Sequence, residues 1–129
     1  MVAPSQARVF HTQQVHYLRK DLTFADTAVL TVGVIPAGAI VVGAGVVVST
    51  AWNSGTSDVL DIGTSGDGDG FATDLSLRTI GNIVWDELAT SNDLYSTSDV
   101  TITCQAASTG TAATAGLGHV YVQYIPPKT

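Results

Sequence analysis

The sequence predicts an all-β fold: a single-domain, jelly-roll-like antiparallel β-sandwich with an extended N-terminal arm. Apolar and polar residues alternate with a period of two along several segments, and these segments are rich in β-branched residues. No window of a dozen residues carries the 3.6-residue apolar stripe of an amphipathic helix. Turns rich in Gly, Pro, Asn and Ser separate the segments, which is typical of sandwiches and jelly rolls. We therefore expect a polar arm over residues 1–26 and a sandwich domain over residues 27–129.

The first predicted strand of the sandwich domain covers residues 27–35. Its alternation places four apolar residues on one face: Ala28, Leu30, Val32 and Val34. A turn over residues 36–38 follows, because Pro36 fixes one backbone angle and Gly38 accepts a positive φ.

The second predicted strand covers residues 40–51 and is apolar on both faces. One face carries Ile40, Val42, Val46 and Val48, and the opposite face carries Val41 and Val47. Such a strand belongs at the centre of a sheet, with cover on both sides from the protein itself or from a neighbouring subunit. Gly43 and Gly45 inside it indicate a bulge or a close approach of two backbones.

A hairpin loop over residues 53–57 leads to the next predicted strand, which begins at residue 58. After a Gly-rich connection, residues 71–77 allow a short helical turn that Asp69 would cap. This part of the chain is therefore the one place where the sequence allows helix.

Three more strands are predicted in the C-terminal half. Residues 82–88 allow one strand, and residues 99–107 and 118–125 have the strongest strand patterns of the chain. In the 99–107 strand, one set of alternating residues is predicted to face the core: Val100, Ile102, Cys104 and Ala106.

Composition narrows the classes of function. The 129 residues carry a net charge of −6, and the few basic residues form no patch beyond Arg19 and Lys20. Nucleic acid and acidic membranes are therefore disfavoured as partners, because binding to them depends on clustered cations. The longest apolar run, residues 37–48, is too short for a bilayer, which needs about 20 residues, and residues 1–20 lack a signal-peptide pattern. Only 12% of residues are charged, which indicates that other chains cover part of the surface.

The stretch DIGTSGDGDGFATD, residues 61–74, combines Gly and Asp as ion-binding loops do. Aligned to a calcium-binding EF-hand loop, Asp67 and Asp69 stand at ligand positions. However, Ser65 and Ser76 stand where the first acidic ligand and the bidentate Glu are needed. A phosphate loop would need a Lys or a following helix, and acidic side chains repel phosphate. We therefore predict a strand-to-turn connection, with weak calcium binding by Asp67 and Asp69 as the open alternative and no cofactor.

No residue pattern indicates catalysis. His11 and His16 are five residues apart, so they point to opposite faces of a strand, and His119 has no partner nearby in the sequence. Cys104 alternates with apolar residues and is predicted to be a small core residue. The chain has no Gly-x-Ser-x-Gly nucleophile motif, so we expect no enzyme activity.

Two long segments resemble small structural proteins of tailed bacteriophages. They read VIPAGAIVVGAGVVVSTAWNSGTSDVLDIGTSGDGDGFATD and TSDVTITCQAASTGTAATAGLGHVYVQYIPP, and the resemblance covers residues 25–126, with residues 59–71 its most specific part. It implies a virion component with a jelly-roll-like sandwich that works by binding and not by catalysis. The implied role is a capsid cement or decoration protein on the exterior of the major capsid protein shell. A tail or receptor-binding fibre subunit that contacts a host glycan or protein is the alternative.

In the cement role, the protein is expected to form homo-oligomers, dimers or trimers, that bridge adjacent capsomers. The candidate interface residues come from the arm, from the end of the 40–51 strand and from the C-terminus: Val9, Phe10, Val15, Tyr17, Leu18, Trp52, Tyr124, Ile125 and Pro126. The arm or the C-terminal segment would add a strand to a neighbour or lie across it. A carbohydrate-binding module that stacks a sugar on an exposed Trp52 is a third possibility, although Trp52 and Trp85 also suit core or interface positions.

Overall fold

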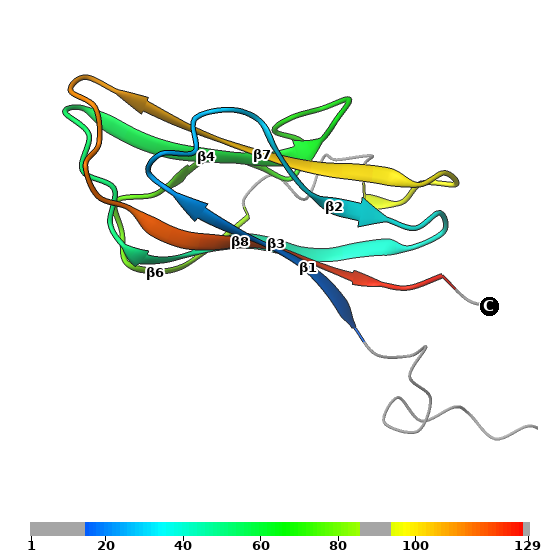
Figure 1. Ribbon diagram of the computed structural model, residues 1–129. Helices are drawn as coiled ribbons and strands as arrows, with labels where there is room; N and C mark the ends of the chain where they lie inside the picture. The colour runs from blue at the N-terminus through cyan, green and yellow to red at the C-terminus, as the bar shows by residue number, and fades with distance from the viewer. Residues whose placement is uncertain (1–14, 86–93, 128–129) are drawn as a thin grey trace, which may run out of the picture.

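A computed structural model describes residues 15–85 and 94–127, and within these ranges the chain forms eight strands in two four-stranded antiparallel sheets. The sheets pack face to face (Figure 1), which confirms the predicted all-β sandwich. The first sheet has the strand order β1 (His16–Thr23), β8 (Leu117–Ile125), β3 (Ile40–Thr50) and β6 (Gly81–Val84). The second sheet has the order β2 (Leu30–Ile35), β7 (Val100–Thr109), β4 (Ser57–Thr64) and β5 (Ala72–Ser76).

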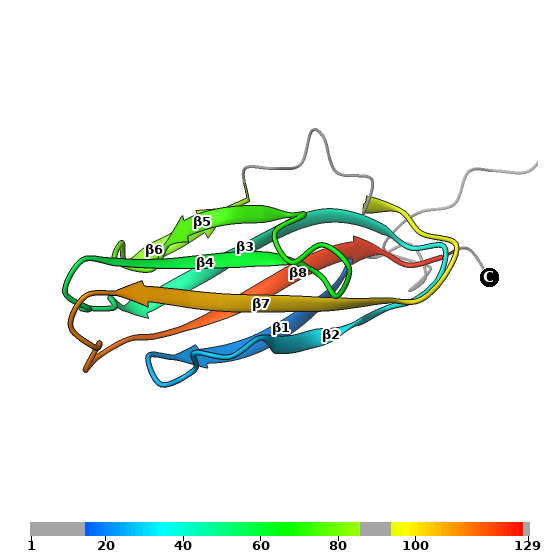
Figure 2. The same ribbon diagram turned by 90° about the horizontal axis from the view of Figure 1, so that it is seen from above.

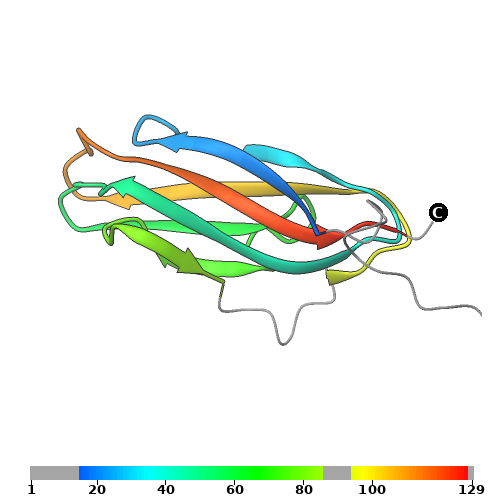
Figure 3. The ribbon, with the colours of Figure 1, turned by 90° about the horizontal axis from the view of Figure 1, so that it is seen from below.

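The strand pairing is that of a jelly roll. β1 pairs with β8, β2 with β7, β3 with β6 and β4 with β5, so the chain is one long nested hairpin that has been rolled up. Two further pairings, β3 with β8 and β4 with β7, complete the sheets. β7 and β4 run through the middle of the second sheet (Figure 2), and β8 and β3 through the middle of the first (Figure 3). The described part of the chain contains no helix that could span a membrane.

Residues 16–23, predicted as part of the arm, form a strand of the sandwich. β1 pairs with β8 from His16 to Thr23. Leu22 is fully buried, and Leu18 packs over Gly33 of β2, where its Cδ atoms lie 2.9 and 3.0 Å from the position of an added Cβ. This contact joins the edge strands of the two sheets. The earlier part of the predicted arm, residues 1–14, lies outside the described residues.

A bulge at Val32 changes which residues of β2 face the core. The pairing with β7 skips from Thr31 to Gly33, so Val32 is an extra residue. One extra residue reverses the alternation after it. Ile35 is therefore buried, and Val34, which the period-two pattern places inside, is 51% exposed.

A second bulge shifts the faces of β3. The pairing with β8 skips from Val41 to Gly43, which confirms the bulge predicted near Gly43. Val41 is buried in the core, as Val46 is, whereas Ile40 and Val42, predicted to share a face with Val46, are 45% and 41% exposed. The predicted faces of Ile40, Val41 and Val42, at the start of β3, were therefore wrong, because the extra residue of the bulge reverses the alternation, as it does in β2.

The helical turn considered for residues 71–77 is a strand. The N–H of Phe71 donates to the carbonyl of Ile62, and β5 then pairs with β4 in an antiparallel hairpin. This pairing satisfies the backbone groups that a helical turn would satisfy locally. The later strand predictions are closer to the structure. β7 and β8 closely match the strands predicted at residues 99–107 and 118–125. β6 covers the beginning of the strand predicted at residues 82–88, of which residues 86–88 lie outside the described ones.

The core fills the space between the sheets with side chains from both inner faces. Its largest apolar members are less than 2% exposed: Leu22, Val46, Val48, Leu60, Ile62, Phe71, Leu77, Ile102, Val120 and Val122. Phe71 also meets Trp85, with ring centroids 6.3 Å apart in a tilted arrangement that aromatic pairs favour. Apart from a few buried polar residues, Asp58 among them, the core is apolar and continuous, which leaves surfaces and loops as the places where function can lie.

Candidate interaction surface

Several predicted interface residues meet at one end of the first sheet, where β1 begins and β8 ends. Val15 and Tyr17 are 54% and 68% exposed, and Ile125 is 41% exposed. The ring of Tyr124 is half-buried and lies 5.7 Å from the ring of His16, its partner in the β1–β8 register. Pro126 follows directly, whereas Val9 and Phe10 lie outside the described residues. This end therefore presents aromatic and apolar side chains beside both ends of the described chain.

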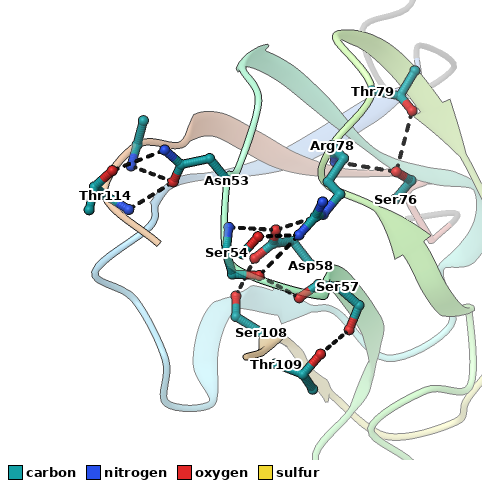
Figure 4. Close-up of polar contacts among 11 residues, drawn as sticks. Asn53, Ser54, Ser57, Asp58, Ser76, Arg78, Thr79, Ser108, Thr109 and Thr114 are labelled. Atoms are coloured by element: carbon teal, nitrogen blue, oxygen red, sulfur yellow. Dashed lines mark hydrogen bonds and ion pairs between the residues drawn. The ribbon is translucent and has the colours of Figure 1, made fainter. Parts of the chain in front are cut away.

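Trp52 is a core residue and does not belong to that surface. It is 3% exposed, and its ring packs on Gly116, where an added Cβ would lie 2.5 Å from the indole. The neighbouring Asn53 holds the opposite loop in place, because its Oδ1 accepts the N–H groups of Thr114 at 2.8 Å and Ala115 at 3.1 Å (Figure 4). A buried indole offers no platform on which a sugar could stack.

The outer surface of β3, β8 and β6 carries no charged side chain; we call it the uncharged face. None of these three strands contains Asp, Glu, Lys or Arg. Large apolar residues are nevertheless exposed along them: Ile40, Val42, Val84, Leu117 and Ile125. The face lies toward the viewer in Figure 3.

Two polar side chains flatten the centre of the uncharged face. Tyr121 lies across Gly45, and its hydroxyl donates to the Oδ1 of Asn82 at 2.7 Å. Gln123 lies across Gly43 in the same way. Because both glycines lack side chains, these two long side chains lie along the sheet and do not stand up from it.

The Gly/Asp loop, residues 65–70, joins β4 to β5 and packs on the outer side of the second sheet. It rises above that sheet in Figure 1 and lies over β4 and β7 in Figure 2. The Thr64 N–H donates to the Asp67 carbonyl at 2.8 Å, and the Thr64 hydroxyl accepts the Asp67 N–H at 3.0 Å. The Asp67 carbonyl sits directly over Gly63, 2.1 Å from the position of an added Cβ. The loop is thus built by backbone bonds and by the space above Gly63.

Neither the Asp67–Asp69 pair nor any other group in the described ranges forms a metal-binding cluster. No three His, Cys, Asp or Glu side chains within residues 15–85 and 94–127 gather closely enough to hold an ion. The nearby carboxylate of Asp61 accepts the N–H of Asp74 at 2.8 Å, and this bond supports the positive φ of 56° at Asp74. The predicted strand-to-turn connection describes this loop well.

Asp58 is the one ionisable core side chain with a network of polar partners in the described structure (Figure 4). Its Oδ2 accepts the Arg78 Nε–H at 3.0 Å and the Ser54 N–H at 3.1 Å. Its Oδ1 accepts the Ser108 hydroxyl at 2.5 Å. Arg78 also donates to the Ser54 carbonyl, so the guanidinium joins the loop to β4.

These partners determine the charge state of Asp58. Burial by itself raises the pKa of the carboxyl, but the bonds from Ser108 and Ser54, aided by the Arg78 charge, outweigh burial and hold the pKa below its ordinary value of 3.8. The side chain is fully buried, whereas Arg78 is 41% exposed. A carboxylate without access to solvent, held by three donors, stabilises the loop and is not placed to exchange protons with a substrate.

The other reactive side chains are dispersed. Cys104 is buried in β7, and burial raises the pKa of its thiol to about 11. His16 is the first residue of β1 and His119 the third residue of β8, while His11 lies outside the described residues. The described structure therefore brings no nucleophile, base and metal ligand together.

The uncharged face is the feature that residue-by-residue reasoning missed. Its signal is present in the sequence: residues 27–57 and residues 100–127 contain no Asp, Glu, Lys or Arg. Only the strand order shows that parts of these two runs, β3 and β8, lie side by side in the first sheet.

The sequence matches no protein-family model and no curated protein. Solved structures with the same fold do match. A chain of the cyanophage Pam1 capsid asymmetric unit has a TM-score of 0.72 at 18% identity, covering 98% of this chain and 93% of that chain. A chain of the acid-stable capsid of Helicobacter pylori bacteriophage KHP30 has a TM-score of 0.59 at 15% identity, covering 88% of this chain and 89% of that chain.

At these identities the likeness defines the fold. The chain is an eight-stranded jelly-roll sandwich over its described length, and the same architecture occurs in chains of two bacteriophage capsids.

Proposed function

We propose that this protein is a structural component of a bacteriophage capsid, and more specifically a cement or decoration protein on the exterior of the major capsid protein shell. The observation that carries the proposal is the near full-length fold likeness to chains of two phage capsids. The resemblance of residues 25–126 to small structural proteins of tailed phages supports the same class from sequence.

The proposed mechanism is binding at an end of the sandwich. Val15, Tyr17 and Ile125 provide exposed apolar and aromatic area where β1 begins and β8 ends, which suits contact with a shell of capsid protein. Each bound copy that spans two capsomers stabilises the closed shell by mass action, because separation of the capsomers would expose the buried contacts again. The net charge of −6 suits the outer side of a shell filled with DNA, where no nucleic acid has to be bound.

A reconstruction of the virion that encodes the protein tests this proposal. The expected result is hundreds of copies per particle, with the jelly roll seen as density on the outer surface of the shell. A few to tens of copies, with density confined to the tail or a fibre, would favour the alternative role in host contact and overturn the capsid role. Density on the inner side of the shell would overturn the exterior placement alone.

Shell stability gives a second measurement. Purified shells that lack the protein are heated with and without added full-length chain, and disassembly is followed by light scattering. We expect disassembly at a higher temperature when the protein is bound. An equal concentration of the chain, first unfolded and alkylated at Cys104, serves as the control that lacks the folded sandwich. Equal disassembly temperatures with native and control protein would contradict the cement role.

A further inference from the structure

The uncharged face exposes more large apolar side chains than is usual for the side of an antiparallel sheet that faces water. Val84 and Leu117 are 58% and 48% exposed, and Ile40 and Val42 lie beside each other at 45% and 41%. An antiparallel sheet whose outer side faces water normally carries polar side chains there. Charged residues are depleted, and Tyr is enriched, at the centres of protein interfaces.

We propose that the uncharged face is a self-association surface that packs against the same face of a second copy of this chain. The proposal is drawn from the charge and exposure of the first sheet alone, so it does not rest on the capsid role.

The absence of net charge on the uncharged face favours a second copy of the chain as its binding partner. In a two-fold interface each face meets itself, so any net charge on the face would be repelled by its own copy. β3, β8 and β6 carry none. At the β1 edge Arg19 and Asp21 lie 3.5 Å apart, so their charges cancel. Lys20 lies on the inner side of the sheet with its register partner Val120, which is fully buried. The uncharged face can therefore meet its copy without electrostatic cost.

The outer side of the second sheet has the opposite character. Asp61 projects from β4 between the core residues Leu60 and Ile62, and the loop 65–70 adds Asp67 and Asp69 on the same side. No Lys or Arg lies in β2, β7, β4 or β5. Two copies of that surface would repel each other, so self-association through the second sheet is disfavoured.

Shape and size agree with pairing through the uncharged face. Tyr121 and Gln123 lie flat over Gly45 and Gly43, and a flat sheet face suits the aligned packing of one sheet on another. The whole outer side of the first sheet is the contact area: β1, β8 and β3, each about 30 Å long, and the shorter β6, with strands about 4.8 Å apart, present about 500 Å² per copy. The uncharged face makes up most of this area, and the edge strand β1 adds the rest. A pair then buries about 1,000 Å², which is the size at which a specific interface begins, so we expect a dissociation constant in the micromolar range.

Sedimentation velocity on the full-length chain tests the proposal. At about 100 μM, above the dissociation constant expected for an interface of this size, the wild type should sediment as a dimer of the 13.3 kDa chain. Val47→Lys places a charge near the centre of the face, because the pair Val47–His119 lies two residues from Gly45 and Tyr121, which pair at the middle of β3 and β8. Its dissociation constant should rise at least about tenfold, because two like charges would be buried together.

A matched pair of variants separates the two sheet faces. Val84→Lys and Val34→Lys make the same change on the edge strands β6 and β2, at side chains 58% and 51% exposed. Val84→Lys should weaken the dimer, and Val34→Lys should leave it unchanged. If Val47→Lys does not fold, the double variant Val84→Lys/Leu117→Lys, altered only at exposed positions, gives the same readout.

Three outcomes would overturn the proposal. One is a wild-type chain that stays monomeric at about 100 μM, the concentration set by the expected affinity. Another is a dimer that Val34→Lys weakens as much as Val84→Lys, and the third is a folded Val47→Lys variant that dimerises as the wild type does. None of these results affects the capsid role, which is measured by binding to shells and by reconstruction.

Discussion

Asp58 shows at the residue scale how the sandwich tolerates a buried charge. Its carboxylate is fully buried at the start of β4, and donors from three different places face it: the loop before β4, the strand β7 and Arg78. A buried charge with such partners costs little, whereas the same charge without them would be strongly destabilising. The sequence could not reveal this network, because Ser108 lies 50 residues from Asp58.

Removal of the Arg78 charge should destabilise the protein markedly. Arg78→Met leaves Asp58 buried without its cation, so we expect the free energy of unfolding to fall by about 2–3 kcal/mol, somewhat below the loss at a fully buried pair because Arg78 is 41% exposed. Urea denaturation measures this change. Arg19→Met is the matched control: Arg19 and Asp21 are both exposed and 3.5 Å apart, so its effect should stay within about 0.5 kcal/mol. Equal losses in the two variants would contradict the role given to Asp58.

Asp58 should also make the protein sensitive to acid. Its pKa is lower in the folded chain than the ordinary 3.8, so its contribution to stability is fully present above that value and is lost as the pH falls through the folded pKa. Asp58→Asn should therefore destabilise the protein at pH 7, and the gap in unfolding free energy between wild type and variant should shrink below about pH 4. Urea titrations at several pH values measure the gap. A gap that stays constant from pH 7 to about pH 3 would show that Asp58 keeps an ordinary pKa.

At the scale of the element, alternation predicted the strands well and their faces poorly. β7 and β8 were predicted almost to their ends because they run without interruption. β2 contains an extra residue at Val32, and β3 contains one at Val42 and another near its end, at Ser49. The extra residues Val32 and Val42 reverse the pattern on one side of the bulge. A Gly follows each of these two, at positions 33 and 43, so the sequence marks these bulges without revealing which residue is extra.

The loop before β8 depends on the missing side chain of Gly116. The indole of Trp52 occupies the place where a Cβ would stand, 2.5 Å away, and Trp52 has no space to retreat because it is 3% exposed. Gly116→Ala should therefore lower the free energy of unfolding by about 2 kcal/mol through overpacking. Urea denaturation again gives the measurement.

Gly68 supplies the control for that prediction. An added Cβ at Gly68 meets nothing within 4 Å, so Gly68→Ala should change stability by no more than about 0.5 kcal/mol. If Gly116→Ala proved as harmless as Gly68→Ala, the contact between Trp52 and Gly116 would not constrain the residue at position 116.

At the scale of the whole molecule, topology explains why the fold class was predictable and the candidate surface was not. Periodicity is local, and it indicated a sandwich without any knowledge of pairing. The uncharged face joins β3 with β8, whose paired outer residues Val47 and His119 are 72 positions apart by their numbers. A surface composed in this way becomes visible only when the nested hairpin is rolled into two sheets.

The order of strands also changes how the N-terminal segment should be tested. Deletion of residues 1–20 would remove five of the eight β1–β8 register pairs, from His16 to Lys20, and would disturb the sandwich itself. Deletion of residues 1–14 leaves every pair in place. If the segment holds the protein to its neighbours, the shorter deletion should keep the wild-type thermal midpoint and lose most of its occupancy on empty shells, measured by co-sedimentation.

The Val34→Lys variant provides the control for that deletion, because it changes an exposed side chain of the second sheet and leaves the N-terminal segment intact. We expect this variant to bind shells as the wild type does. Unchanged occupancy after deletion of residues 1–14 would exclude the segment from the contact with the shell. The contact would then have to come from the described end of the sandwich, where Tyr17 and Ile125 remain exposed, and Tyr17→Ala combined with Ile125→Ala would become the decisive variant.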